Sequence, residues 1–282
     1  MVPQNYTNTG TVGDFSVHYE RDLTSKDRLS LIIRHELSRY ELPNDQVQQT
    51  WCYAPGQVSG PPRQRQDADN FETMGIVSYE HTFSPDVLAS FRGMVRDNAN
   101  DFYSNPNSTP VLVFQHNWFR EGYFKGTITV HHGRQEWKAG VESDNIFLNE
   151  DFRYNIPNIP MDTNQFDPGT PLNFGFAANR PDLEQSAFVQ DLIRLGNWTI
   201  NAGVRWDHYQ LLLNRQAVDP RFSIARYFPS AGLTLHFSYD RVFQTPSFEN
   251  ILLSSSTAAT SLDPVSLQLP VSLPKEITTR RA

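Results

Sequence analysis

Apolar and polar residues alternate over most of this chain. Within 198–206, one side carries Trp198, Ile200, Ala202, Val204 and Trp206, while the residues between them are mostly polar or small. A period of two residues is typical of a strand with one apolar face. Together with turn residues, it predicts about ten strands: 14–22, 28–40, 71–83, 87–103, 119–131, 135–155, 185–195, 198–213, 219–228 and 231–243. No segment has a convincing helical period, so the pattern indicates an all-β protein.

The connections between these strands alternate between short and long. Tight turns such as Ser84-Pro85-Asp86 and Gly196-Asn197 alternate with the long polar segments 41–70, 104–118 and 156–184. A soluble sandwich has no reason to sort its loops in this way. An up-and-down antiparallel sheet in an outer membrane does, because its turns are short at one end and long at the other. The connections therefore favour a transmembrane barrel wall.

Strand length and the aromatic positions point the same way. Trp198 and Trp206 lie eight residues apart on one face, which is about 26 Å along a strand. An outer-membrane barrel has an apolar band about 25 Å tall, bounded by aromatic girdles. The sequence thus predicts membrane lipid as the neighbour of the apolar face, with Trp198 and Trp206 as interface anchors.

The opposite faces are too polar for a dry core. They carry Arg34, Glu36, Glu80, Arg92, Arg96, Glu142, Asp144, Arg205 and Asp207, and charged side chains are seldom fully buried unless paired. A wet lumen or bulk solvent would accommodate them. Arg92, Arg96, Arg205 and Asp207 are the best candidates for lumen-facing charges. Two interpretations stay open for them: contact with a plug or a translocating ligand, or cross-strand ion pairs.

Composition narrows the classes of protein. The chain has 282 residues, a formal net charge of −7 and 20% charged residues, which argues against a nucleic-acid partner. No apolar run approaches the roughly 20 residues of a spanning helix. The single cysteine, Cys52, excludes an intrachain disulfide framework and the usual zinc sites.

No catalytic or cofactor motif emerges from the sequence. His131 and His132 are adjacent, so a strand would point them to opposite faces, and we interpret them as polar residues beside a turn. We interpret Ser254-Ser255-Ser256 as a flexible loop, and the acidic pairs Asp67/Asp69 and Glu150/Asp151 as solvated loop faces without calcium-loop spacing. We therefore expect no enzyme activity, no metal site and no cofactor, and no ligand-binding residue is identified.

Two segments resemble a known family. The run Phe188-Val189-Gln190-Asp191, followed by Arg194-Leu195-Gly196 and by 200–207 (INAGVRWD), resembles barrel strands of TonB-dependent outer-membrane receptors. Residues 238–253 (SYDRVFQTPSFENILL) are similar to a barrel segment of the receptors with an N-terminal carboxypeptidase-regulatory-like domain. The resemblance spans most of 12–253.

This resemblance implies a bacterial outer-membrane protein with a 22-stranded barrel plugged by an N-terminal domain. It further implies uptake of a scarce small ligand, driven through TonB. Iron chelates, cobalamin and oligosaccharides all remain open as that ligand.

The number of strands suggests only part of such a barrel. No secretory signal, TonB box or plug is present, so we expect an internal fragment, with a partial barrel in 1–253 and an irregular tail in 254–282. Two other hypotheses stay open. One is a soluble antiparallel β-sheet module that binds carbohydrate, and the other is a non-functional truncated product with exposed sheet edges.

Overall fold

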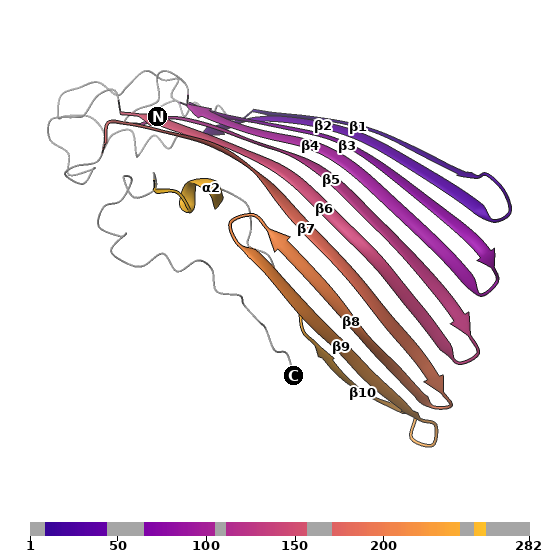
Figure 1. Cartoon of the computed structure of the whole chain (residues 1–282). Coiled ribbons are helices and arrows are strands. Elements are labelled where there is room, and N and C mark those ends of the chain that lie inside the picture. Colours follow the sequence, from indigo (N-terminus) through magenta and orange to yellow (C-terminus); the bar gives the residue numbers. More distant parts are fainter. Residues whose placement is uncertain (1–8, 44–64, 105–110, 157–170, 243–250, 258–282) are drawn as a thin grey trace.

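The described part of the chain forms a single curved sheet (Figure 1). A computed structural model describes residues 9–43, 65–104, 111–156, 171–242 and 251–257. Its ten strands pair antiparallel in sequence order, which confirms the all-β, up-and-down prediction. The strands are β1 Gly10–Asp22, β2 Asp27–Pro43, β3 Arg65–Ser84, β4 Val87–Ser104, β5 Leu112–His132, β6 Gln135–Asn155, β7 Asn173–Leu195, β8 Trp198–Gln210, β9 Asn214–Phe228 and β10 Leu233–Asp240.

Several strands differ in length from the sequence pattern: β1, β2 and β9 are longer than predicted, β8 and β10 are shorter, and the largest extensions are in β3, β5 and β7. β3 begins at Arg65, β5 at Leu112 and β7 at Asn173, where alternation predicted starts at 71, 119 and 185. The predicted loops 41–70, 104–118 and 156–184 were therefore wrong at their ends. The reason is visible in β7, where Pro181 interrupts the pattern but pairs in register with Phe147 of β6. Pairing with a long neighbouring strand overrides weak local propensity.

The turns that follow β1, β3, β5, β7 and β9 all lie at one end of the sheet, whereas the short β8–β9 connection, residues 211–213, lies at the opposite end. Gly133, Gly196 and Gly232 lie in three of these turns with φ of 61°, 59° and 61°, a left-handed conformation that glycine adopts without a steric penalty. The predicted turn at Gly196-Asn197 is confirmed. Successive strands are thus reversed at fixed points, and this fixes the register of each hairpin.

The register steps regularly across the sheet. One row of paired residues passes through Asp27, Ala89, Ala139 and Val204. These are the first residue of β2, the third of β4, the fifth of β6 and the seventh of β8. Counted from the turn end of the sheet, the paired row moves along by about one residue from each strand to the next. With strands about 4.8 Å apart, this corresponds to a strand tilt of about 35° from the axis of a barrel. Such a stagger is typical of a barrel wall.

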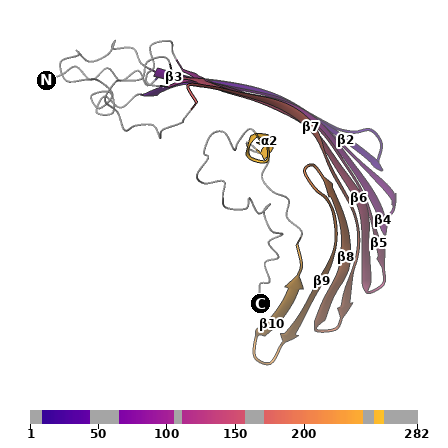
Figure 2. The ribbon, with the colours of Figure 1, turned by 60° about the vertical axis from the view of Figure 1, so that its left-hand side comes forward.

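The two faces of the sheet are distinguished by α2, a short helix over Ile251–Ser254. Figure 2 shows α2 in the hollow of the curved sheet, so the face that it contacts is concave. Leu252 packs there in a small core with Ile146, Leu148, Tyr209 and Leu211. Within the described residues, no helix has the length and apolar character to cross a membrane.

The convex face carries the apolar residues that the sequence placed together. Trp198, Val204 and Trp206 point outward and are 38%, 42% and 37% exposed. Going from the turns toward the long connections, the outward residues of β4 change from Phe91 and Val95 to Asp97. The convex face is therefore an apolar band at the turn end, with a polar margin beyond it.

Candidate functional site: the concave face of the sheet

The predicted lumen-facing charges all lie on the concave face. Arg205 donates hydrogen bonds to Asp207 at 2.7 Å and to Glu142 of β6 at 3.3 Å. Lys125 of β5 adds an ion pair to Glu142 at 3.3 Å. Because Arg205 joins carboxylates from two strands, it ties β6 to β8 across the intervening β7. Arg92 lies on the same face, opposite Lys125 in register, outside this network.

Arg96 forms a second network nearer the long connections. Its guanidinium donates two hydrogen bonds, from Nε at 2.8 Å and from Nη2, to the same carboxylate oxygen of Glu121. Glu72 lies 3.8 Å away on the other side. The Glu121 side chain is only 6% exposed, so Arg96 neutralises a carboxylate that would otherwise be costly to bury. The ring of Phe119 lies under the guanidinium at 4.9 Å.

Two carboxyl groups beside these networks have no such partner. In both Asp144 and Asp182, one carboxylate oxygen is buried without a hydrogen bond. Asp182 is only 4% exposed. Asp144 lies in register with Glu184 of β7, so acidic groups gather at this part of the concave face.

The core under α2 depends on a residue that the sequence analysis misassigned. Glu150, expected on a solvated loop, lies within β6 and is 4% exposed. Its carboxylate accepts hydrogen bonds from the backbone N–H groups of Leu252 at 3.0 Å and Leu253 at 2.9 Å. The free N–H groups at a helix start favour an anion. This contact joins residues 102 positions apart, so no local signal could have revealed it.

The serine run lies at the end of α2. Ser254 is the last helical residue, so the predicted loop begins only at Ser255, where a turn follows. The hydroxyls of Ser255 and Ser256 donate to the carbonyl oxygens of Leu252 and Leu253 at 3.2 and 2.7 Å. These hydrogen bonds satisfy carbonyl groups at the end of the helix.

The other sequence candidates do not come together. His131 and His132 end β5 beside the turn and, by strand alternation, point to opposite faces. Asp67 and Asp69 lie in β3 on the convex face rather than in a loop, and Asp151 pairs with Arg153 at 2.6 Å. Among the residues that the structure describes, no group of three His, Cys, Asp or Glu could hold a metal ion.

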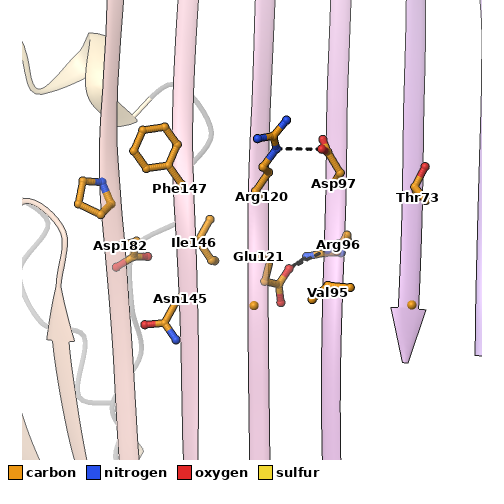
Figure 3. Close-up of a pocket in the computed structure, with 13 residues that line it drawn as sticks. Thr73, Val95, Arg96, Asp97, Arg120, Glu121, Asn145, Ile146, Phe147 and Asp182 are labelled. Atoms are coloured by element: carbon orange, nitrogen blue, oxygen red, sulfur yellow. Dashed lines mark hydrogen bonds and ion pairs between the residues drawn. The ribbon is translucent and has the colours of Figure 1, made fainter. Parts of the chain in front are cut away.

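A depression of about 620 Å³ lies on the convex face, above the apolar band (Figure 3). Gly75 and Gly122 leave room in it, and Val95 and Phe147 line its sides. Arg120 and Asp97 pair across its margin at 2.9 Å, as Figure 3 shows. Arg96 and Glu121 also border this hollow, but strand alternation places their side chains on the concave face, where they pair with each other. We therefore do not count the hollow as part of the candidate site.

Aromatic side chains cover the concave face beyond the charged networks. Tyr154 and Phe174 stack with ring centroids 5.7 Å apart, and Phe152 lies 6.1 Å from Phe174. These residues lie at the loop ends of β6 and β7. The concave face thus changes from ion pairs to aromatic rings along its length.

Comparison with known proteins identifies this architecture. The sequence profile of the family described as "TonB dependent receptor-like, beta-barrel" matches residues 14–268. No curated protein matches the chain.

Solved structures agree on the fold. The ferric citrate transporter FecA in its unliganded form superposes with a TM-score of 0.62 at 11% identity, covering 85% of this chain and 37% of FecA. The siderophore receptor PiuA from Acinetobacter baumannii superposes with a TM-score of 0.59 at 13% identity, covering 88% of this chain and 46% of PiuA. The ferric yersiniabactin uptake receptor FyuA from Yersinia pestis superposes with a TM-score of 0.61 at 10% identity, covering 84% of this chain and 39% of FyuA. The chain spans less than half of each of these proteins.

Proposed function

Because the chain belongs to the TonB-dependent receptor β-barrel family, we propose that its ten strands form part of the wall of an outer-membrane transporter that takes up a scarce small ligand. The family comprises outer-membrane transport barrels rather than enzymes. The observation that carries the proposal is the combination of the regular stagger with two unlike faces. The convex band meets lipid, and the charged concave face lines an aqueous lumen.

The ligand route follows the concave face in this proposal. Lumen-facing ion pairs such as Arg96–Glu121 and Arg205–Asp207 hold the wall rigid and keep it wet. The ligand itself is an iron chelate, cobalamin or an oligosaccharide, and a plug domain in the lumen couples its movement to TonB. FecA, PiuA and FyuA carry names that refer to iron chelates. That likeness supports the first class of ligand for this wall.

We also propose that the intact gene product carries an N-terminal carboxypeptidase-regulatory-like domain. The segment SYDRVFQTPSFENILL supports this assignment. Reading the gene upstream tests it directly: we expect that domain, then a plug, then further barrel strands. Flanking sequence without a plug would contradict both the domain assignment and the coupling to TonB.

An uptake experiment tests the function itself. A deletion strain and its complemented parent would be supplied with labelled iron chelate, cobalamin or maltooligosaccharide, with and without a protonophore. We expect the deletion strain to lose accumulation of one ligand class. In the complemented strain, we expect the protonophore to abolish accumulation of that same class. Equal uptake by both strains for all three classes would contradict the proposal.

The soluble-module hypothesis is disfavoured by the exposed apolar band and by the family. Cell fractionation separates the two: we expect the protein in the outer-membrane fraction, extractable only with detergent. A cooperatively folded monomer in detergent-free buffer would contradict the membrane assignment. We further expect that the 282-residue chain alone does not transport solute. Leakage from solute-loaded liposomes after addition of the refolded chain would contradict this expectation.

A further inference from the structure

A cavity of about 320 Å³ lies on the concave face between β7 and α2. Four residues of β7 form one side, and residues from the β8–β9 connection, from α2 and from the turn after α2 form the other. The lining residues are Phe176, Ala178, Asn179, Arg180, Leu212, Leu252, Ser255 and Ser256. Figure 1 and Figure 2 place α2 over the concave side of the sheet near β7. Its volume falls in the range of pockets that hold small molecules.

The apolar residues that line this cavity are held in place by the packing around them. Phe176, Ala178 and Leu212 pack against the buried cluster that contains Leu252. Glu150 fixes α2 from below through two backbone N–H groups. Each carboxylate oxygen of Glu150 accepts one of these bonds. The apolar side chains of the lining can therefore bury an apolar group in a cavity whose walls are held in place.

Among the described residues that line this cavity, Arg180 is the only charged one. It belongs to β7, where residues 176, 178 and 180 share one face by strand alternation. Among the residues that the structure describes, no hydrogen bond or ion pair is recorded for its guanidinium. A guanidinium offers a planar fork of donors that fits a carboxylate. The cavity thus combines an apolar floor with an available anion-binding group.

The aromatic residues next to Phe176 extend the same surface. Phe174, Tyr154 and Phe152 follow on the concave face, with Tyr154 and Phe174 stacked at an interplanar angle of 20°. Tyr154 is held in place because its hydroxyl donates to the carbonyl oxygen of Pro171 at 3.1 Å. Fixed aromatic faces favour flat apolar ligands.

We propose that this pocket binds a small planar aromatic molecule bearing a carboxylate, with its ring against Phe176 and Leu252 and its carboxylate on Arg180. The proposal deepens the uptake function and rests on it, because the concave face is the ligand route in that function. The part of the transported ligand that this wall recognises is then an anionic aromatic group.

Binding of naphthoate to the refolded full chain in detergent micelles tests the pocket. Naphthamide, an uncharged compound of the same shape, is the matched ligand. By saturation-transfer NMR and calorimetry, we expect saturable binding of naphthoate and at least about tenfold weaker binding of naphthamide, since one charge-assisted contact is lost. Equal affinity for the two compounds, or non-saturable partitioning only, would overturn the proposal.

Two variants locate the site. Arg180→Gln should weaken naphthoate binding about tenfold and leave naphthamide binding unchanged, whereas Arg180→Lys should retain part of the affinity. Arg120→Gln removes an exposed arginine from the convex face, where it pairs with Asp97, and this variant should bind naphthoate as the parent chain does. If Arg120→Gln weakens binding as much as Arg180→Gln does, the pocket is not the site.

A filling variant protects the test against loss of folding. Ala178→Trp places a ring inside the cavity and should abolish binding while the strand content, measured by circular dichroism, stays that of the parent. Unchanged affinity in Ala178→Trp overturns the proposal. These assays measure naphthoate binding to the purified chain, so they can fail while the intact gene product still takes up its ligand. Conversely, uptake can fail while the purified chain still binds naphthoate.

Discussion

The convex and concave faces of this sheet are built from adjacent residues of the same strands, yet their chemistry is opposite. On β8, Val204 is 42% exposed on the convex face, while Arg205 beside it contacts two carboxylates on the concave face. An exposed valine is costly in water but not in lipid. A charged group needs partners or water. The difference shows that each face is matched to its own solvent.

Reversing this match should have the largest effect. Val204→Arg puts a charge in the apolar band and should lower the free energy of unfolding by about 2–4 kcal/mol in lipid vesicles. Asn201→Arg, on the concave face of the same strand, is the matched control and should cost far less. Denaturant titration of refolded protein measures both. Equal losses for the two variants would show that the convex face does not meet lipid.

Breaking a concave-face ion pair should rank second. Arg96→Met leaves the carboxylate of Glu121, whose side chain is 6% exposed, without its main partner. We expect a loss of about 2–3 kcal/mol, because a buried charge without a partner is more costly than no charge. The double variant Arg96→Met with Glu121→Leu should recover most of that loss. A double variant as unstable as the single one would argue against this pairing.

The contact between Glu150 and α2 should have a smaller, local effect. Glu150→Ala removes the acceptor for two backbone N–H groups and should destabilise the docked segment by about 1–3 kcal/mol. Hydrogen exchange of the Leu252 and Leu253 amides should speed up accordingly, while the amides of β3 keep their protection. Glu150→Gln, which retains an acceptor oxygen, should have an intermediate effect.

The smallest effect concerns a buried carboxyl group of the concave face. Asp182 is 4% exposed, and one of its carboxylate oxygens is buried without a hydrogen bond. Asp182→Asn removes the cost of burying this charge and should stabilise the sheet by about 1–2 kcal/mol. Denaturant titration of the refolded protein measures the gain. A variant that is less stable than the parent would contradict this account of Asp182.

The alternation of residues predicted which side chains share a face, because this depends only on strand geometry. Arg96, Arg205 and Asp207 were assigned to the correct face for that reason. Their partners were not predicted, since the meeting of Arg96 with Glu121 depends on the register between β4 and β5. The loop ends of β3, β5 and β7 were missed for a similar reason: pairing with a neighbour extends these strands through polar residues and Pro181.

By itself, the sequence determined the strand count, the two faces, the positions of the turns and the family resemblance, because all of these are periodic or local. The domain division at residue 253 stays a prediction. Only the tertiary structure decided the regular stagger of the strands, the burial of Glu150 beneath α2 and the pocket beside Arg180. Each of these joins residues far apart in the sequence, and contacts between distant residues are set by the register of the whole sheet.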